Sequence, residues 1–132
     1  YTTVMGTDNR YRKKLGAWGE TFAADFLSRK GYLLVEKNFH TRYGEIDLIM
    51  KSAEQLVAVE VKTRRSGKYG IAEDSITRKK YQSIQAAMSI FLEEHPELRH
   101  EWQLDILVIE AAAGAKPAII HYENIYLDYL NE

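Results

Sequence analysis

The chain has 132 residues, of which 45% are hydrophobic, and its formal net charge is −1. This length and composition are typical of a single domain with a proper hydrophobic core. The net charge excludes a globally basic nucleic-acid-binding protein, so such a function would have to depend on local patches of positive charge. Because the chain has no cysteine, disulfide bonds, thiol catalysis and cysteine-ligated zinc are also excluded.

The apolar segments are too short for a membrane span, which needs roughly 20 residues. The N-terminus has no apolar signal-peptide segment either. We therefore expect a soluble cytoplasmic protein with no membrane partner. Residues 1–12 are polar and aperiodic and are predicted to form a loose N-terminal arm, whereas residues 13–132 are predicted to form the domain.

A first helix is predicted from about Lys13 to Lys30, and Gly31 is expected to end it. Glu20 lies beside the apolar stripe of this helix, and from the helix alone we favour an ordinary solvated glutamate. The apolar residues at helical spacing are Leu15, Trp18, Phe22 and Phe26. The positive residues at the helix start are Arg12, Lys13 and Lys14.

Two predicted strands, joined by a short polar turn, carry carboxylates among apolar residues. A turn over residues 52–55 would place Asp47 opposite Glu60 and Glu45 opposite Lys62. Two carboxylates would then lie on one face with Cβ atoms roughly 5 Å apart, where like charges repel. A divalent cation, a neighbouring ammonium such as that of Lys62, or a raised pKa on one carboxylate would compensate.

Positive residues also follow this hairpin. The loop over residues 63–75 is basic, and a second helix, predicted from Thr77 to about Glu94, begins with three positive residues. Positive charge at a helix N-terminus opposes the helix dipole, so either an anion such as a phosphate backbone lies there or the charges are simply solvated. The basic residues concerned are Arg64, Arg65, Lys68, Arg78, Lys79 and Lys80.

Further strands are predicted at residues 32–35, 102–110 and 118–122, with a polar connection over residues 36–42. Asp105 is the remaining carboxylate on a mostly apolar strand, and we expect an arginine or a backbone amide as its partner. The four histidines show no HxH or HExxH spacing, so a histidine metal site is not expected.

An aspartate on one strand, a Glu-x-Lys pattern on its neighbour and nearby positive charge together suggest metal-dependent phosphodiester hydrolysis. Hard oxygen ligands suit Mg²⁺ or Mn²⁺. Such an ion neutralises the scissile phosphate and lowers the pKa of a bound water, while a lysine beside it orients that water or stabilises the developing charge.

The segments GEIDLI (residues 44–49) and VEVKTR (residues 59–64) look like the D and ExK half-motifs of PD-(D/E)XK nucleases. The chain more closely resembles the bacterial YraN-like family, which is related to Holliday junction resolvases. The segments GAWGE (residues 16–20) and LDIL (residues 104–107) add to this resemblance, which covers roughly residues 14–109. One departure is at residues 78–81, where relatives tend to carry proline and then glutamine.

The resemblance implies a restriction-endonuclease-like α/β fold, with a mixed central sheet of about five strands flanked by helices. It implies that Asp47 and Glu60 bind Mg²⁺ or Mn²⁺ together with the Val61 carbonyl. Lys62 would be the catalytic lysine, and Glu20 an additional ligand or water contact. Structured or branched DNA is the implied substrate, and a homodimer the implied assembly.

Two other interpretations remain at this point. In the first, the protein keeps a nuclease fold but acts as a nucleic-acid-binding or adaptor protein with little or no turnover. In the second, Glu45 and Lys62 form a cross-strand ion pair and the remaining pattern is incidental.

Overall fold

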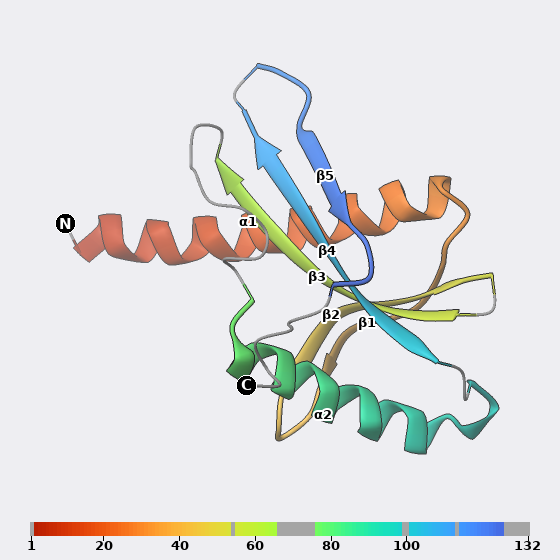
Figure 1. The fold of residues 1–132 in the computed structure, drawn as a ribbon. Coiled ribbons are helices and arrows are strands. Elements are labelled where there is room, and N and C mark those ends of the chain that lie inside the picture. Colours follow the sequence, from red (N-terminus) through yellow and green to blue (C-terminus); the bar gives the residue numbers. More distant parts are fainter. Residues whose placement is uncertain (1, 54, 66–75, 99–100, 113, 126–132) are drawn as a thin grey trace.

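A computed structural model gives the arrangement of the chain (Figure 1). It describes residues 2–53, 55–65, 76–98, 101–112 and 114–125, and for residues 2–9, 11 and 12 the backbone alone. The elements are α1 (Thr2–Arg29), β1 (Leu33–His40), β2 (Glu45–Ser52), β3 (Gln55–Arg65), α2 (Arg78–Glu94), the 3₁₀ helix η2 (Pro96–Leu98), β4 (Trp102–Ala111) and β5 (Ala118–Tyr122).

The strands form one mixed sheet of five strands in the order β1-β2-β3-β4-β5. Neighbouring strands are antiparallel except β3 and β4, which are parallel and are connected through α2. A parallel pair needs such a crossover, whereas an antiparallel pair can be joined by a tight turn. The predicted α/β class and mixed five-stranded sheet are confirmed, and the arrangement is consistent with a restriction-endonuclease-like fold.

The two long helices pack against different groups of residues from the sheet (Figure 1). Buried residues of α1 pack with one group: Ala23 and Leu27 with Leu48, Met50, Val57, Val59, Leu107 and Ile109. Buried residues of α2 pack with the other: Ile84, Ala87, Met88 and Phe91 with Phe39, Ile46, Ile49, Leu56, Ala58 and Leu104. Since side chains alternate along a strand, the central strands are buried on both faces.

The first helix is longer than the sequence predicts. Its backbone is helical from Thr2, so residues 2–12, predicted to be a loose arm, belong to α1. No proline interrupts this segment, but it lacks the apolar periodicity from which a helix is predicted. The predicted end is confirmed: Gly31 has a φ of 99° and lies in a Schellman motif, with the Tyr32 N–H donating to the Leu27 carbonyl at 3.0 Å.

The strand predicted at residues 32–35 is also too short. The structure has β1 over Leu33–His40, paired with β2 and carrying a register shift between Leu34 and Glu36. Residues 36–40, predicted to be a connection, belong to this strand. An edge strand with exposed polar residues gives no clear alternation in the sequence, which explains the error.

The other predicted elements are confirmed, with small differences at their ends. The α2 helix begins after Thr77, whose Oγ1 accepts a hydrogen bond from the Lys80 N–H at 3.0 Å. None of the helices in the described residues is long and apolar enough to cross a membrane.

Candidate functional site

The β2–β3 hairpin is tighter than predicted, and its ladder stops short of the carboxylates. The predicted Lys51–Leu56 pair is present, but Ser52 and Gln55 also pair, so the turn is shorter than residues 52–55. The ladder ends at Leu48 and Val59. The predicted backbone pairs Asp47–Glu60 and Glu45–Lys62 are therefore not formed.

A cavity of about 320 Å³ lies where the ladder ends. It takes its walls from α1, the start of β2, the later part of β3 and the first turn of α2. Its lining residues are Leu15, Gly16, Glu20, Glu45, Asp47, Glu60, Val61, Lys62, Thr63 and Lys80. The structure thus brings together every side chain predicted to be catalytic, although α1 and the hairpin are separate in the sequence.

Asp47 is held in this cavity by the backbone of β3. Its Oδ2 accepts a hydrogen bond from the Val61 N–H at 2.8 Å. This bond gives the Val61 amide an acceptor beyond the end of the ladder. The Asp47 carboxylate is thereby placed beside Glu60 even though their backbones are not paired.

Burial raises the pKa of both carboxyl groups. Burial, followed by the charge of Asp47, raises the pKa of Glu60 to about 7, although Lys80 and Lys62 oppose this shift. Burial also raises the pKa of Asp47, opposed by the Val61 amide and by Lys80. The charge of one carboxyl group therefore affects the titration of the other.

Lys80 lies in the first turn of α2, as predicted, and contacts a residue of the hairpin. Its place at the start of α2 suggested a contact with DNA, but its Nζ lies 3.5 Å from Glu60 Oε2, inside the cavity. The anion that compensates this positive charge at the helix N-terminus is therefore the protein's own carboxylate. The sequence pattern does not predict that the start of α2 lies beside the hairpin.

The predicted partnership of Glu45 and Lys62 is wrong. Glu45 Oε2 lies 2.8 Å from His40 Nδ1 across the β1–β2 pair. Lys62 is exposed and lines the cavity. This arrangement removes the basis for treating the hairpin charges as a simple cross-strand ion pair.

Glu20 is half-buried and lines the cavity, so the interpretation as a freely solvated glutamate is wrong. Burial, followed by the charge of Asp47, raises the pKa of the Glu20 carboxyl, while a hydrogen bond with Asn38 opposes the shift. The neighbouring Gly19 allows α1 to approach β3 closely, because a Cβ at this position would overlap the Thr63 side chain.

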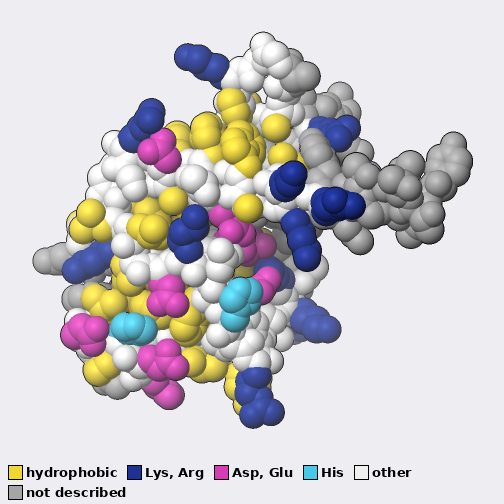
Figure 2. All heavy atoms as spheres, turned by 180° about the vertical axis from the view of Figure 1, so that it is seen from behind, with side chains coloured by type: hydrophobic (Ala, Val, Ile, Leu, Met, Phe, Trp, Pro, Cys, Tyr) yellow, Lys and Arg dark blue, Asp and Glu magenta, His cyan; other side chains and the backbone are white. Residues whose placement is uncertain are grey.

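The residues predicted to contact nucleic acid differ in their exposure and in their contacts with the rest of the protein. Arg64 Nε is 3.2 Å from Glu110 Oε2, so part of its guanidinium is engaged within the sheet. The Arg12 side chain and the whole of Lys68 lie outside the described residues. The exposed ones are Lys13, Lys14, Arg65, Arg78 and Lys79. Figure 2 shows Lys and Arg side chains gathered beside a recessed group of Asp and Glu side chains.

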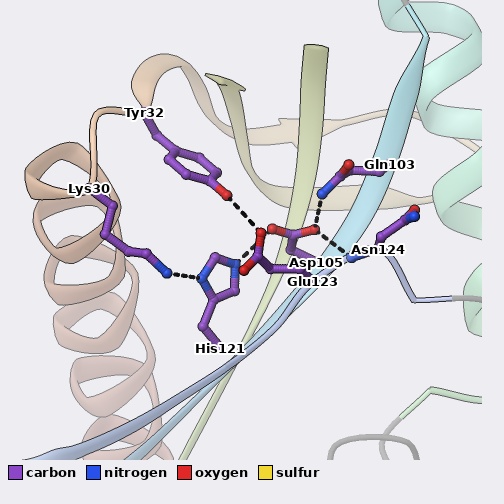
Figure 3. A network of polar contacts seen from close by, with 7 residues as sticks. All are labelled: Lys30, Tyr32, Gln103, Asp105, His121, Glu123 and Asn124. Atoms are coloured by element: carbon purple, nitrogen blue, oxygen red, sulfur yellow. Dashed lines mark hydrogen bonds and ion pairs between the residues drawn. The ribbon is translucent and has the colours of Figure 1, made fainter. Parts of the chain in front are cut away.

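A second polar cluster surrounds Asp105 (Figure 3), and none of its residues lines this cavity. Asp105 Oδ1 accepts from the Asn124 N–H at 2.9 Å, which confirms the predicted backbone amide, and from Gln103 Nε2 at 2.8 Å. Its Oδ2 lies 2.7 Å from His121 Nε2. Ligand atoms of Asp105, His121 and Glu123 lie within 4.8 Å of one another, close enough to hold a metal ion. We expected no histidine metal site because of the spacing of the histidines along the sequence. That spacing does not show which residues the pairing of β4 with β5 brings together.

A larger cavity of about 680 Å³ adjoins this cluster, near the beginning of β3, and contains none of the predicted catalytic residues. Its lining residues are Tyr32, Ser52, Ala53, Gln55, Val57, Glu101, Gln103 and Glu123. We therefore place the candidate catalytic site in the smaller cavity, because the chemistry of its side chains matters more than its volume.

Comparison with known proteins gives consistent family matches. The model of the uncharacterised protein family UPF0102 matches residues 19–109, which include the four predicted catalytic residues. A UPF0102 protein of Syntrophomonas wolfei is 40% identical over 114 residues, which cover 86% of this chain and 98% of the relative. One from Herpetosiphon aurantiacus is 36% identical over 121 residues, covering 89% of this chain and 97% of the relative. One from Bifidobacterium longum is 37% identical over 125 residues, covering 92% and 100% respectively. The chain therefore belongs to the uncharacterised protein family UPF0102.

Proposed function

We propose that this protein is a Mg²⁺- or Mn²⁺-dependent endonuclease that hydrolyses phosphodiester bonds in structured or branched DNA. The observation that supports this most is the meeting of Glu20, Asp47, Glu60 and Lys62 in one cavity. The PD-(D/E)XK resemblance of the hairpin supports the same reaction, and the resemblance to junction resolvases supports a branched substrate and a homodimer.

The chemistry of the cavity fits a hard divalent cation. Asp47 and Glu60 offer carboxylate oxygens, and Val61 lines the same cavity. Mg²⁺ and Mn²⁺ prefer such oxygen donors, usually together with water and substrate phosphate. A bound cation would offset the charge repulsion that, after burial, raises the pKa of Glu60. Glu20, half-buried in the same cavity, would hold a coordinated water or join the ligand set.

When bound, the cation would supply a polarised phosphate and a water of lowered pKa. The other roles in the reaction belong to side chains of this protein. Lys62, exposed at the cavity, orients the attacking water and stabilises negative charge that develops on the phosphate. Lys80 holds Glu60 in place and adds a second ammonium to the same side of the cavity. Glu20 positions water next to Asp47.

The second candidate function is a nucleic-acid-binding or adaptor protein with little or no turnover. The contact of Lys80 with Glu60 favours it, because an ammonium at 3.5 Å neutralises part of the carboxylate charge without a metal ion. The exposed positive side chains would serve this function equally well. Only a measurement of turnover separates the two.

Cleavage assays test the proposal. Linear duplex, single-stranded, flapped and four-way-junction DNA are incubated with the protein, with and without Mn²⁺. We expect metal-dependent cleavage, strongest on the branched substrates, and a loss of at least about 100-fold in Glu60→Ala and Lys62→Ala. The matched controls Glu97→Gln and Lys116→Ala change exposed side chains outside the cavity and should cleave like the parent protein.

Two outcomes would reject the enzyme proposal at this site. One is the absence of metal-dependent cleavage of any substrate. The other is cleavage that survives both cavity substitutions, because it would come from a contaminant or from another part of the protein. Junction binding without cleavage would support the adaptor instead.

A further inference from the structure

The cluster around Asp105 is separate from the candidate catalytic cavity. Asp105 of β4 pairs with Val59 of β3, and Glu60 is the next residue along β3. Because successive side chains of a strand point to opposite faces, Asp105 and Glu60 lie on opposite faces of the sheet. The function of the Asp105 cluster therefore has to be sought independently of the proposed nuclease site.

Asp105 is a fully buried carboxylate with one oxygen fixed and the other directed into the cluster. Oδ1 accepts hydrogen bonds from the Gln103 amide at 2.8 Å and from the Asn124 N–H at 2.9 Å. Oδ2 faces His121 (Figure 3). Outer hydrogen bonds of this kind hold the ligands of metal sites in a set orientation.

His121 is held between Asp105 and a lysine. Its side chain is 5% exposed, with Nε2 2.7 Å from Asp105 Oδ2 and Nδ1 2.8 Å from Lys30 Nζ. Since an ammonium can only donate, Nδ1 accepts and Nε2 carries the ring hydrogen.

The cluster brings two carboxylates together at its centre. Oxygens of Asp105 and Glu123 lie within 4.8 Å of each other, and Lys30 is on the far side of the His121 ring (Figure 3). The Tyr32 hydroxyl donates to Glu123 Oε1 at 3.5 Å. A buried carboxylate normally has a charged partner or a metal ion.

We propose that Asp105, His121 and Glu123 bind one divalent transition-metal ion, with Zn²⁺ as the best-suited ion. Zn²⁺ takes imidazole nitrogen and carboxylate oxygen as ligands, and three protein ligands leave a fourth position for water. Tyr32, Gln103 and Glu123 also line the 680 Å³ cavity, through which the ion and a completing water reach the site.

Binding requires a change of tautomer at His121. Nε2 gives up its hydrogen to become a ligand, Nδ1 takes up a hydrogen, and the exposed Lys30 side chain turns into solvent. Solvent accepts the Nε2 proton and supplies the Nδ1 proton, so the charge of the ring does not change. The ion then fixes the residues after β5 to the centre of β4.

The test uses untagged protein carrying Asp47→Asn and Glu60→Gln, which removes the candidate catalytic ligands. Zn²⁺ is titrated by calorimetry and Co²⁺ by its visible absorption. We expect one ion per chain in this background. Glu123→Gln, at an exposed residue whose change should not disturb folding, and His121→Gln should each weaken binding by at least about tenfold. At a given Zn²⁺ concentration the melting temperature of the background protein should rise more than that of the Glu123→Gln variant.

Control variants make the assignment specific. Lys30→Met removes the group that holds the competing tautomer and should tighten binding several-fold, whereas His40→Gln, a histidine outside the cluster, should leave it unchanged. Absence of a bound ion in the background protein would overturn the proposal. So would affinity that is unchanged in both Glu123→Gln and His121→Gln, because the ion would then be bound elsewhere. Neither result depends on DNA cleavage.

Discussion

At the scale of single residues, Glu60 is the side chain whose chemistry the structure defines best. It is 9% exposed, lines the same cavity as Asp47 and pairs with Lys80. Burial and the nearby negative charge both disfavour its ionised form. The folded protein therefore carries an electrostatic cost at Glu60 that a bound cation or a proton relieves.

This cost should make the stability of the metal-free protein depend on pH. The pKa of Glu60 is raised from its ordinary value of 4.5 to about 7, so its contribution to stability is fully present below pH 4.5 and is lost as the pH rises through 7. We expect Glu60→Gln and the parent protein to have equal stability at pH 4, and Glu60→Gln to be more stable by roughly 1–3 kcal/mol at pH 8.

Urea denaturation with EDTA at both pH values measures this difference, and Glu97→Gln is the exposed control. A Glu60→Gln variant that is less stable than the parent protein at pH 8 would show that the carboxylate is well compensated. In that case the ionised Glu60 carboxylate would not destabilise the metal-free protein.

At the scale of elements, the close approach of α1 to β3 brings Glu20 to the hairpin. A Cβ at Gly19 would overlap the Thr63 side chain, whereas a Cβ at Gly16 meets nothing within 4 Å. The two glycines, one turn apart on the same helix, therefore form a matched pair for substitution.

We expect Gly19→Ala to destabilise the protein by roughly 1–3 kcal/mol, because the overpacking cost exceeds the gain in helix propensity. Gly16→Ala should stabilise it by up to about 1 kcal/mol. Thr63→Ala removes the nearest overlapping atom and should recover much of the Gly19→Ala loss in the double variant. Thermal and urea unfolding of the parent protein, Gly19→Ala, Gly16→Ala, Thr63→Ala and the Gly19→Ala/Thr63→Ala double variant measure these effects. Equal effects of the two glycine substitutions would mean that α1 does not depend on this contact.

The sequence predicted elements wherever apolar residues recur with a clear period. Carboxylates stood out on β2 and β3 because their neighbours are apolar, and this contrast pointed to Asp47 and Glu60. The early part of α1 and the end of β1 lack that contrast, since the first is polar and the second is an exposed edge. Their true extents were therefore missed.

The sequence also missed contacts that depend on how elements pack. Lys80 reaches Glu60 only because the first turn of α2 lies beside the hairpin, and His121 reaches Asp105 only through the register of β4 with β5. Neither contact can be predicted from the spacing of residues along the sequence. The Glu45–Lys62 pair failed for a related reason, because the ladder ends before it and His40 on β1 is closer to Glu45.

At the scale of the whole molecule, the charge distribution matters more than its sum. The net charge is −1, yet exposed positive residues occur at the start of α2, at the end of β3 and along α1. Long-range attraction of DNA by such a molecule depends on these local groups and is weakened by salt.

We expect Arg65→Ala combined with Lys79→Ala to weaken DNA binding. The slope of log K against log salt should fall by about one for each lost phosphate contact. Lys116→Ala, an exposed lysine in the β4–β5 connection, is the control and should change neither quantity. Fluorescence anisotropy at several salt concentrations gives both the affinity and the slope. An unchanged slope in the double variant would mean that these charges only face solvent.

We propose that Asp47 and Glu60 hold the cation while Lys62 acts on the phosphate. Measuring Mn²⁺ affinity and single-turnover cleavage of junction DNA on the same samples of Glu60→Gln and Lys62→Met tests it most directly. We expect Glu60→Gln to lose both Mn²⁺ binding at this site and cleavage, and Lys62→Met to keep Mn²⁺ binding while cleavage falls by at least about 100-fold. Parent-like cleavage by Lys62→Met, or unchanged Mn²⁺ affinity in Glu60→Gln, would contradict the account.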